Sequence, residues 1–163
     1  MSSEFPASSE FPSRFPSAEE SPGFQLWRAS NLWQQSVRHA LTPFGLTHVQ
    51  LVLLSVTAYL TQQGAEANQI QIAQAAQTDK MMTSQVIRTL QERGLVERSV
   101  QPNDARARRV SITEAGRRLL AEALPAVENA DATFFGVLGE EVGTLSRLAV
   151  RLADAKAEIE LYD

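Results

Sequence analysis

The stretch Asn68–Thr113 constrains the fold more than any other part of this 163-residue chain. Apolar residues recur at three- and four-residue steps over 70–76 and again over 80–93, which indicates two short amphipathic helices. The polar residues Gln77–Asp79 separate the two patterns, and Gly94 follows the second, where glycine commonly ends a helix. The sequence therefore predicts a helix-turn-helix.

Two weakly alternating segments follow the second helix. Leu95–Val100 and Arg108–Ile112 flank a loop, 101–107, that contains the turn-forming residues Pro, Asn and Asp. This pattern is typical of a β-hairpin, and Thr113 is a suitable N-cap for the helix after it. A helix pair followed by a basic hairpin predicts a winged helix-turn-helix with a two-stranded wing.

Further helical patterns lie on both sides of this module. They cover Phe24–Leu41, Val49–Leu60, Glu114–Phe135 and Glu140–Ile159, and Pro125 predicts a kink in the third of them. We therefore expect a mainly α (α+β) fold of six helices and one hairpin. The first, fifth and sixth helices carry apolar stripes that so small a domain leaves uncovered. An interlocked homodimer is the economical way to bury them.

The chain divides at a change in composition near residue 22. Residues 1–22 are rich in Ser, Glu and Pro and contain the sequence SEFP twice, so we expect a disordered tail. A short partner-binding motif is the alternative interpretation of that tail. Within the single domain at 23–163, residues 46–113 form the predicted DNA-binding lobe, and 24–45 and 114–163 supply the predicted dimerisation helices.

Charge is unevenly distributed along the chain. The whole sequence carries a net charge of −4, but residues 77–118 contain nine basic and five acidic residues, a local excess of +4. Such a basic segment on an acidic body is the electrostatic pattern of a DNA-binding surface. The chain has no cysteine, no uncharged apolar run long enough to span a membrane and no signal-peptide pattern, so we expect a cytoplasmic protein without disulfides.

The second helix of a helix-turn-helix enters the major groove, and its N-terminal residues meet the base edges. Several residues of 80–93 fall outside the predicted apolar face and have side chains suited to bases or phosphates. These candidate DNA-binding residues are Lys80, Thr83, Ser84, Gln85 and Arg88. A solvated helix face without a ligand would show the same residue types, and the basic wing favours DNA binding.

The wing adds four candidates for DNA binding: Asp104, Arg106, Arg108 and Arg109. An arginine near the tip of a hairpin can enter a narrow minor groove, where the electrostatic potential is most negative. Asp104, two residues before Arg106, can hold that guanidinium in position through a charge-assisted hydrogen bond. An exposed pair without function is the alternative, and such pairs add only about 0–1 kcal/mol to stability.

Two segments, DKMMTSQVIRTLQERGLVER and PNDARARRVSITEAGRRLL, closely resemble the multiple-antibiotic-resistance regulator (MarR) family. The most specific part is the motif D-x-R at Asp104–Arg106, followed by an alternating segment that ends with Ser111–Thr113 and by a helix that opens with Glu114–Gly116. The motif LxxxGLVER at Leu90–Arg98 fits as well. The resemblance covers the chain from about Phe24 onward and excludes the tail.

This resemblance implies an obligate homodimer with interlocked terminal helices. It also implies repression of transcription at palindromic operators in double-stranded DNA, with release when a small molecule binds. By the same resemblance, Arg106 enters the minor groove and Asp104 orients it. Many relatives carry a basic residue where Gln85 stands, which leaves the base preference open.

The family commonly binds small aromatic or phenolic effectors between the dimer helices and the DNA-binding lobe. Near the junction of the first two helices, an aromatic wall and a titratable donor are available from Trp33, His39, Phe44 and His48. Ordinary core packing is the competing interpretation of the aromatic residues. The two histidines lack the spacing and carboxylate partners of a zinc site, so we expect neither a metal nor another cofactor.

The first functional hypothesis is a dimeric, sequence-specific DNA-binding repressor that responds to a small molecule. The alternative is a winged helix that serves as a protein-interaction module, or a ligand sensor without a direct DNA target. The sequence lacks the G-x-S-x-G, phosphate-loop, H-E-x-x-H and dinucleotide-binding motifs, so we do not expect an enzyme.

Overall fold

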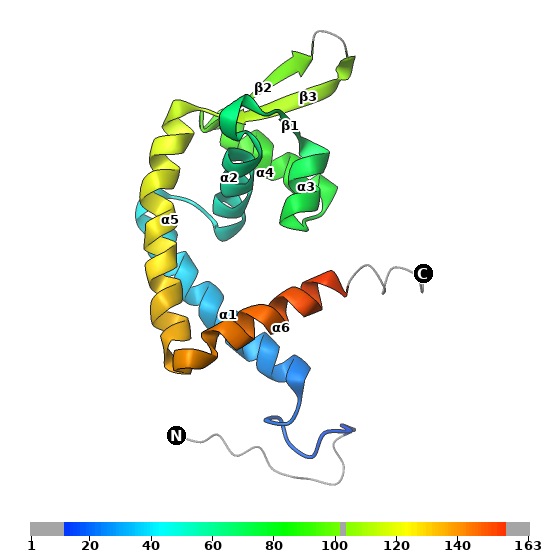
Figure 1. Cartoon of the computed structure of the whole chain (residues 1–163), viewed down its shortest axis with the longest axis vertical. Coiled ribbons are helices and arrows are strands. Elements are labelled where there is room, and N and C mark those ends of the chain that lie inside the picture. Colours follow the sequence, from blue (N-terminus) through cyan, green and yellow to red (C-terminus); the bar gives the residue numbers. More distant parts are fainter. Residues whose placement is uncertain (1–11, 102–103, 156–163) are drawn as a thin grey trace.

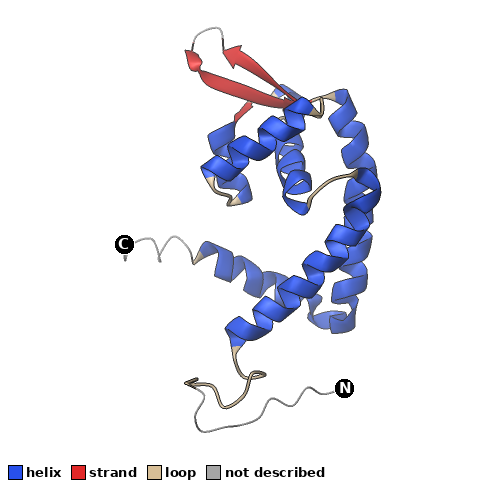
Figure 2. Cartoon of the chain, turned by 180° about the vertical axis from the view of Figure 1, so that it is seen from behind, coloured by secondary structure: helices blue, strands red, loops and turns tan. Residues whose placement is uncertain are grey.

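The computed structural model describes residues 12–101 and 104–155, without the side chains of residues 63 and 100–108. In chain order, the elements are α1 (Pro22–Leu41), α2 (His48–Leu60), β1 (Ala67–Asn68), α3 (Gln69–Ala76), α4 (Lys80–Glu92), β2 (Val96–Gln101), β3 (Asp104–Ile112), α5 (Glu114–Phe135) and α6 (Val142–Asp154). Figure 1 shows a lobe, made of the three strands with α2, α3 and α4, on a stem made of α1, α5 and α6. The wing, β2 and β3, projects from the end of the lobe opposite the stem (Figure 1, Figure 2).

The apolar helix α2 lies at the centre of the lobe, as its sequence predicts. Leu53 and Leu54 are fully buried, and the helix packs against α3, α4, α5 and β3. The buried Thr57 hydroxyl donates to the Leu53 carbonyl oxygen (2.7 Å), so its polarity is satisfied inside the helix. Thr47 caps the helix and forms a capping box with Gln50. This capped helix supports α3 and α4, which both pack against it.

The sheet contains three antiparallel strands in the order β1-β3-β2, whereas the sequence predicts only the two-stranded hairpin. β1 is limited to Ala67–Asn68, too short to show an alternating pattern, and Ala67 pairs with Val110 of β3. β3 begins at Asp104 and not at the predicted Arg108. Residues 104–107, predicted to be loop, therefore belong to the strand. Asp104 pairs with Gln101, and the register of the hairpin shifts between Val100 and Gln101.

The stem is built on two long helices, since α1 packs along α5 (Figure 1). A 3₁₀ turn, η3 (Gly136–Glu141), connects α5 to α6. The predicted start of the last helix, Glu140, lies in this turn because Gly139 adopts a φ of 53° and interrupts the helix. Every residue of α6 is described and none is buried in the single chain. The predicted end of this helix, Ile159, lies outside the described residues.

Part of the predicted tail is described. Residues 12–21 form bends and a turn, and the Gln25 side chain donates a hydrogen bond to the Ala18 carbonyl oxygen (2.7 Å). Ser21 caps α1, and Pro22 occupies its first turn, a position that suits proline. The first helix therefore begins slightly before the predicted boundary. Residues 1–11 lie outside the described residues, so disorder there stays a prediction.

A tight corner joins α1 to α2. The 3₁₀ turn η1 (Thr42–Phe44) is followed by Gly45, whose φ of 59° lies in the left-handed region that favours glycine. Arg93, at the end of α4, donates hydrogen bonds to the carbonyl oxygens of Gly45 (2.8 Å) and Phe44 (3.4 Å).

Among the described helices, none alone is long and apolar enough to cross a membrane. One pair of helices, α1 with η1 and then α2, has the length and composition of a membrane span when the two are taken together, but they are bent by 74° relative to each other.

Candidate DNA-binding surface and effector site

Three consecutive polar residues hold the turn between α3 and α4. Gln77 ends α3 with a φ of 50°, in the left-handed region, and the Thr78 amide donates back to a carbonyl oxygen of α3 (2.9 Å). Asp79 caps α4, since its Oδ1 accepts from the amides of Met81 (2.8 Å) and Met82 (2.9 Å). The predicted helix-turn-helix therefore has a hydrogen-bonded turn that sets the direction of α4.

Thr83 lies on the buried face of α4, together with Ile87 and Leu90 at i+4 and i+7. Its hydroxyl donates to the Asp79 carbonyl oxygen (2.7 Å). Because a hydroxyl has only one proton, Thr83 then accepts from the Thr78 hydroxyl (2.8 Å). The prediction that Thr83 is exposed to DNA is wrong, because its hydroxyl is satisfied inside the protein and stabilises the turn.

The opposite face of α4 carries the remaining predicted residues. We define the recognition stripe as four exposed residues at i, i+3, i+4 and i+7: Met81, Ser84, Gln85 and Arg88. Lys80 is exposed at the N-terminal end of the same helix. The Arg88 Nε pairs with Glu92 (3.0 Å), but the two side chains are 75% and 63% exposed, so the pair contributes little and Arg88 can exchange it for another anion.

The wing is described in part. Asp104, Arg106 and Arg108 belong to β3, but their side chains lie outside the described part of the chain, so their DNA contacts stay predictions. Arg109 is described, and its Nη1 forms an ion pair with Glu66, which lies just before β1. Contact between Arg109 and DNA would require exchange of this acidic partner.

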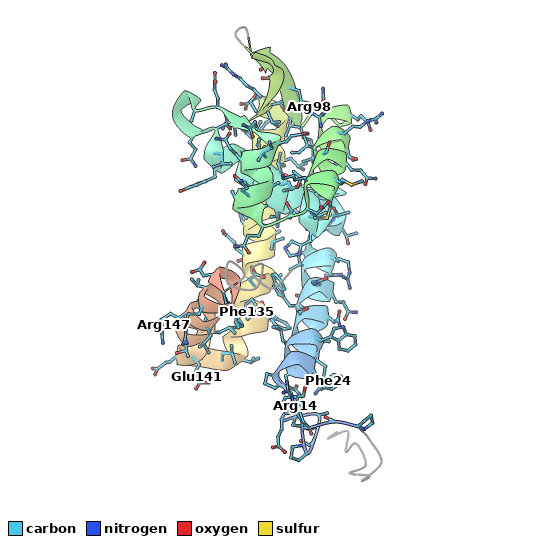
Figure 3. The ribbon with its side chains drawn as sticks, turned by 90° about the vertical axis from the view of Figure 1, so that its right-hand side faces the viewer. Arg14, Phe24, Arg98, Phe135, Glu141 and Arg147 are labelled. Carbon is cyan, nitrogen blue, oxygen red and sulfur yellow. The ribbon has the colours of Figure 1, made fainter. Side chains whose placement is uncertain are left out.

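Two arginines of the basic segment stabilise the fold. Arg98 of β2 donates through Nη2 to the Ser84 carbonyl oxygen (3.3 Å), which ties the wing to α4 (Figure 3). Arg93 ties the end of α4 to the corner between α1 and α2. Both guanidinium groups keep their positive charge, but these hydrogen bonds hold them against the protein. Sequence reasoning missed these roles because the acceptors lie 14 and 48 residues away along the chain.

The structure brings together two of the candidate effector residues and adds two residues of α5. Trp33 Nε1 donates to Asp131 Oδ1 (2.7 Å), and the Trp33 and His48 rings meet edge to face with centroids 5.1 Å apart. The Phe135 ring lies 6.1 Å from that of Trp33, at the lower end of α5 (Figure 3). We call Trp33, His48, Asp131 and Phe135 the junction cluster. It joins α1 and α5 of the stem to His48, the first residue of α2 in the lobe.

The other two effector candidates have different surroundings. His39 is exposed on α1, whereas Phe44 packs against the core. Asp131 was missed by sequence reasoning, because it lies 98 residues from Trp33 and no local pattern connects the two. Within the described residues, no group of three or more His, Cys, Asp or Glu side chains could hold a metal ion.

Partial burial lowers the pKa of His48 below its usual value of 6.5, and the negative charge of Asp131 opposes this shift. The unfolded chain therefore binds a proton at this position more readily than the folded protein does. It follows that the contribution of His48 to the free energy of unfolding is fully present above pH 6.5 and is lost as the pH falls below that value.

We expect the free energy of unfolding to decline below pH 6.5 in the wild type and to decline less in His48→Gln. Denaturant titrations on both sides of this pH measure the difference. His39→Gln replaces an exposed histidine on α1 and is the matched control, which should keep the wild-type decline. An identical pH dependence in the wild type and in His48→Gln would contradict the prediction.

A hydrogen-bonded turn, a following helix with an exposed polar face and a β-hairpin beside it define a winged helix-turn-helix DNA-binding protein. Residues 46–107 match the model of the MarR family. The uncharacterised HTH-type transcriptional regulator YdcH of Bacillus subtilis (strain 168) is 42% identical over 139 residues, which cover 85% of this chain and 95% of YdcH. The chain therefore belongs to the MarR family, whose members are transcriptional regulators and not enzymes.

Solved structures of regulators have the same fold. A MarR-family transcriptional regulator from Rhodococcus sp. RHA1 matches with a TM-score of 0.71 and 27% identity, over 83% of this chain and 93% of that chain. BpsR of Bordetella bronchiseptica, whose DNA binding is regulated by 6-hydroxynicotinic acid, matches with a TM-score of 0.76 and 28% identity, over 84% of this chain and 96% of that chain. The predicted family and winged-helix fold are confirmed.

Proposed function

We propose that this protein represses transcription by binding, as a homodimer, to a palindromic DNA operator, and that a small aromatic or phenolic effector releases it. The recognition stripe carries the DNA-binding part of the proposal, because its side chains are exposed on the face of α4 opposite the core. Ser and Gln side chains can bond to bases or phosphates, and Arg can bind a guanine edge through two hydrogen bonds. Lys80 adds a cation at the leading end of the helix.

The stem supplies the surface for the proposed dimer. α1 and α6 expose large apolar side chains to water in the single chain, among them Leu26 (62%), Trp27 (62%), Leu32 (58%), Val150 (58%) and Leu152 (68%). Full burial of one such side chain contributes about 1.5–3 kcal/mol, so burial of several of them favours the pairing of two stems. Two lobes held in this way would present their recognition stripes to half-sites about 10–10.5 base pairs apart.

An electrophoretic shift assay with the DNA upstream of the protein's own gene tests the proposal. We expect a dimer, verified by sedimentation, whose affinity falls steeply as the salt concentration rises, because Lys and Arg side chains displace counterions from the phosphates. No shift at about 50 mM salt, where even nonspecific binding is visible, would favour the protein-interaction module instead.

The junction cluster is the proposed effector site. It connects the stem to the lobe, so a ligand that inserts beside Trp33 would change the position of one relative to the other. Trp33 offers an aromatic surface, and His48 and Asp131 add polar groups. Regulation of BpsR by 6-hydroxynicotinic acid supports an aromatic effector for this protein.

Thermal-shift measurements with a panel of aromatic and phenolic acids test this site. A ligand at a hundred times its Kd stabilises the native protein by about 2.7 kcal/mol and raises its Tm. We expect Trp33→Leu to lose this rise and His39→Ala, which changes an exposed side chain of α1, to keep it. The same compound should release DNA from the wild type. If no compound does both, the junction cluster is not the effector site.

A further inference from the structure

We propose that Met81 reads DNA sequence by contacting the 5-methyl group of a thymine in the major groove. This proposal rests on the proposed binding of DNA through α4. It extends recognition from the hydrogen-bonding side chains of that helix to an apolar one.

The exposure and position of Met81 motivate the proposal. Its side chain is 82% exposed, more than Tyr59 (72%) or Ile70 (53%), the next most exposed large apolar side chains among the described residues of the lobe. Most other side chains of this kind lie on α1 and α6, where the proposed dimer would cover them. Met81 instead begins the recognition stripe, one helical turn before Ser84 and Gln85. If the recognition stripe of α4 meets the base edges of DNA, these edges therefore cover Met81.

The surroundings of Met81 disfavour a phosphate group as its partner. The Asp79 carboxylate accepts the amides of Met81 (2.8 Å) and Met82 (2.9 Å), so it occupies these donors and places a negative charge at this end of the helix. The thioether of Met81 has no N–H or O–H group to donate to a phosphate oxygen.

The chemistry of the groove identifies the partner. Among the base edges of the major groove, the thymine 5-methyl is the apolar group. Lys80 before Met81 and Arg88 two turns after it are exposed cations that complement the phosphates on either side of the groove. The exposed thioether lies between them along the helix, which points to a base edge and not to the backbone.

The test uses the full-length protein and an operator selected by that protein from a pool of random-sequence duplexes. Each thymine of the selected duplex is then replaced by deoxyuridine, which removes only the 5-methyl group. At one thymine in each half-site, we expect the affinity of the wild type to fall about fourfold per methyl group, which corresponds to the loss of one buried methyl. Met81→Ala should bind the thymine duplex more weakly and should not distinguish thymine from uracil.

Met82→Ala is the matched control, because Met82 is the next residue in the same turn, is 39% exposed and lies outside the recognition stripe. It should keep the dependence on the methyl group. Circular dichroism and Tm should show that Met81→Ala is folded, because alanine suits an exposed helical position. The proposal is overturned if no thymine is sensitive, or if Met81→Ala keeps the sensitivity, while specific binding survives. If the selection yields no preferred sequence, both this proposal and sequence-specific DNA binding fail.

Discussion

Arg106→Ala should reduce the affinity for the operator more than any other single substitution in the wing. Position 106 lies in β3, close to the end of the hairpin, and an arginine there can enter a minor groove of negative potential. One such contact contributes about 1–3 kcal/mol, and a dimer carries two copies, so we expect a loss of about 2–6 kcal/mol per dimer. Fluorescence-anisotropy titrations of the selected operator at several salt concentrations measure it.

Two neighbouring substitutions show whether the effect belongs to this contact. Arg109→Ala should reduce the operator affinity less than Arg106→Ala does, because Glu66 already pairs with the Arg109 guanidinium in the free protein. Asp104→Ala should lose part of the operator affinity that Arg106→Ala loses. Positions two apart on a strand share a face, so a carboxylate at 104 can orient the guanidinium at 106. Operator affinity that is unchanged in Arg106→Ala would remove the wing from DNA recognition and leave the recognition stripe as the main contact.

Gly116→Ala should lower the free energy of unfolding by about 3 kcal/mol, the upper end of the usual cost of overpacking. Gly116 is buried in the first turn of α5, and its amide donates to the Thr113 hydroxyl (3.0 Å). A Cβ at this position would lie within 3.0 Å of the Leu95 backbone and of Ile112 Cγ1. Because the main obstruction is backbone, no change of rotamer relieves it. Denaturant titration measures the loss.

Gly23→Ala is the control for this substitution. A Cβ at Gly23, in the first turn of α1, meets nothing within 4 Å, so alanine there should be neutral or stabilising by up to about 1 kcal/mol. Gly116→Ala should also weaken DNA binding, because Thr113 ties α5 to the base of the wing through its hydrogen bond to the Gly94 carbonyl oxygen (2.7 Å). If Gly116→Ala unfolds with the same free energy as the wild type, the prediction is wrong, and α5 can move away from Leu95 without loss of stability.

The helix boundaries of the DNA-binding lobe were predictable because their signals are local. Asn68 caps α3 and forms a capping box with Gln71, and Asp79, the last residue of the turn, caps α4, as residues of these types commonly do. Gly94 follows the end of α4 with a φ of 68°, in the left-handed region that the sequence position suggests. Each of these contacts spans only a few residues, so the order of the residues is enough to reveal it.

Thr83 shows where such local reasoning fails. A threonine in a helix looks polar and therefore exposed, but its hydroxyl can bond to the carbonyl oxygen four residues earlier and so tolerate burial. Which face of α4 turns inward is decided by its packing on α2, and this placed Thr83 beside Ile87 and Leu90. β1 was missed for a related reason, since a strand of two residues is defined only by its partner.

The sequence by itself determined the family, the helix-turn-helix and the basic character of the segment that follows it, because motifs, caps and charge can be seen along the chain. Only the tertiary structure decided which side chains serve each surface. Folding brings Asp131 to Trp33 across 98 residues and Arg93 to Gly45 across 48 residues. It also leaves Met81, and not Thr83, on the exposed face of α4. These pairings depend on how helices pack in three dimensions, and no local spacing encodes that packing.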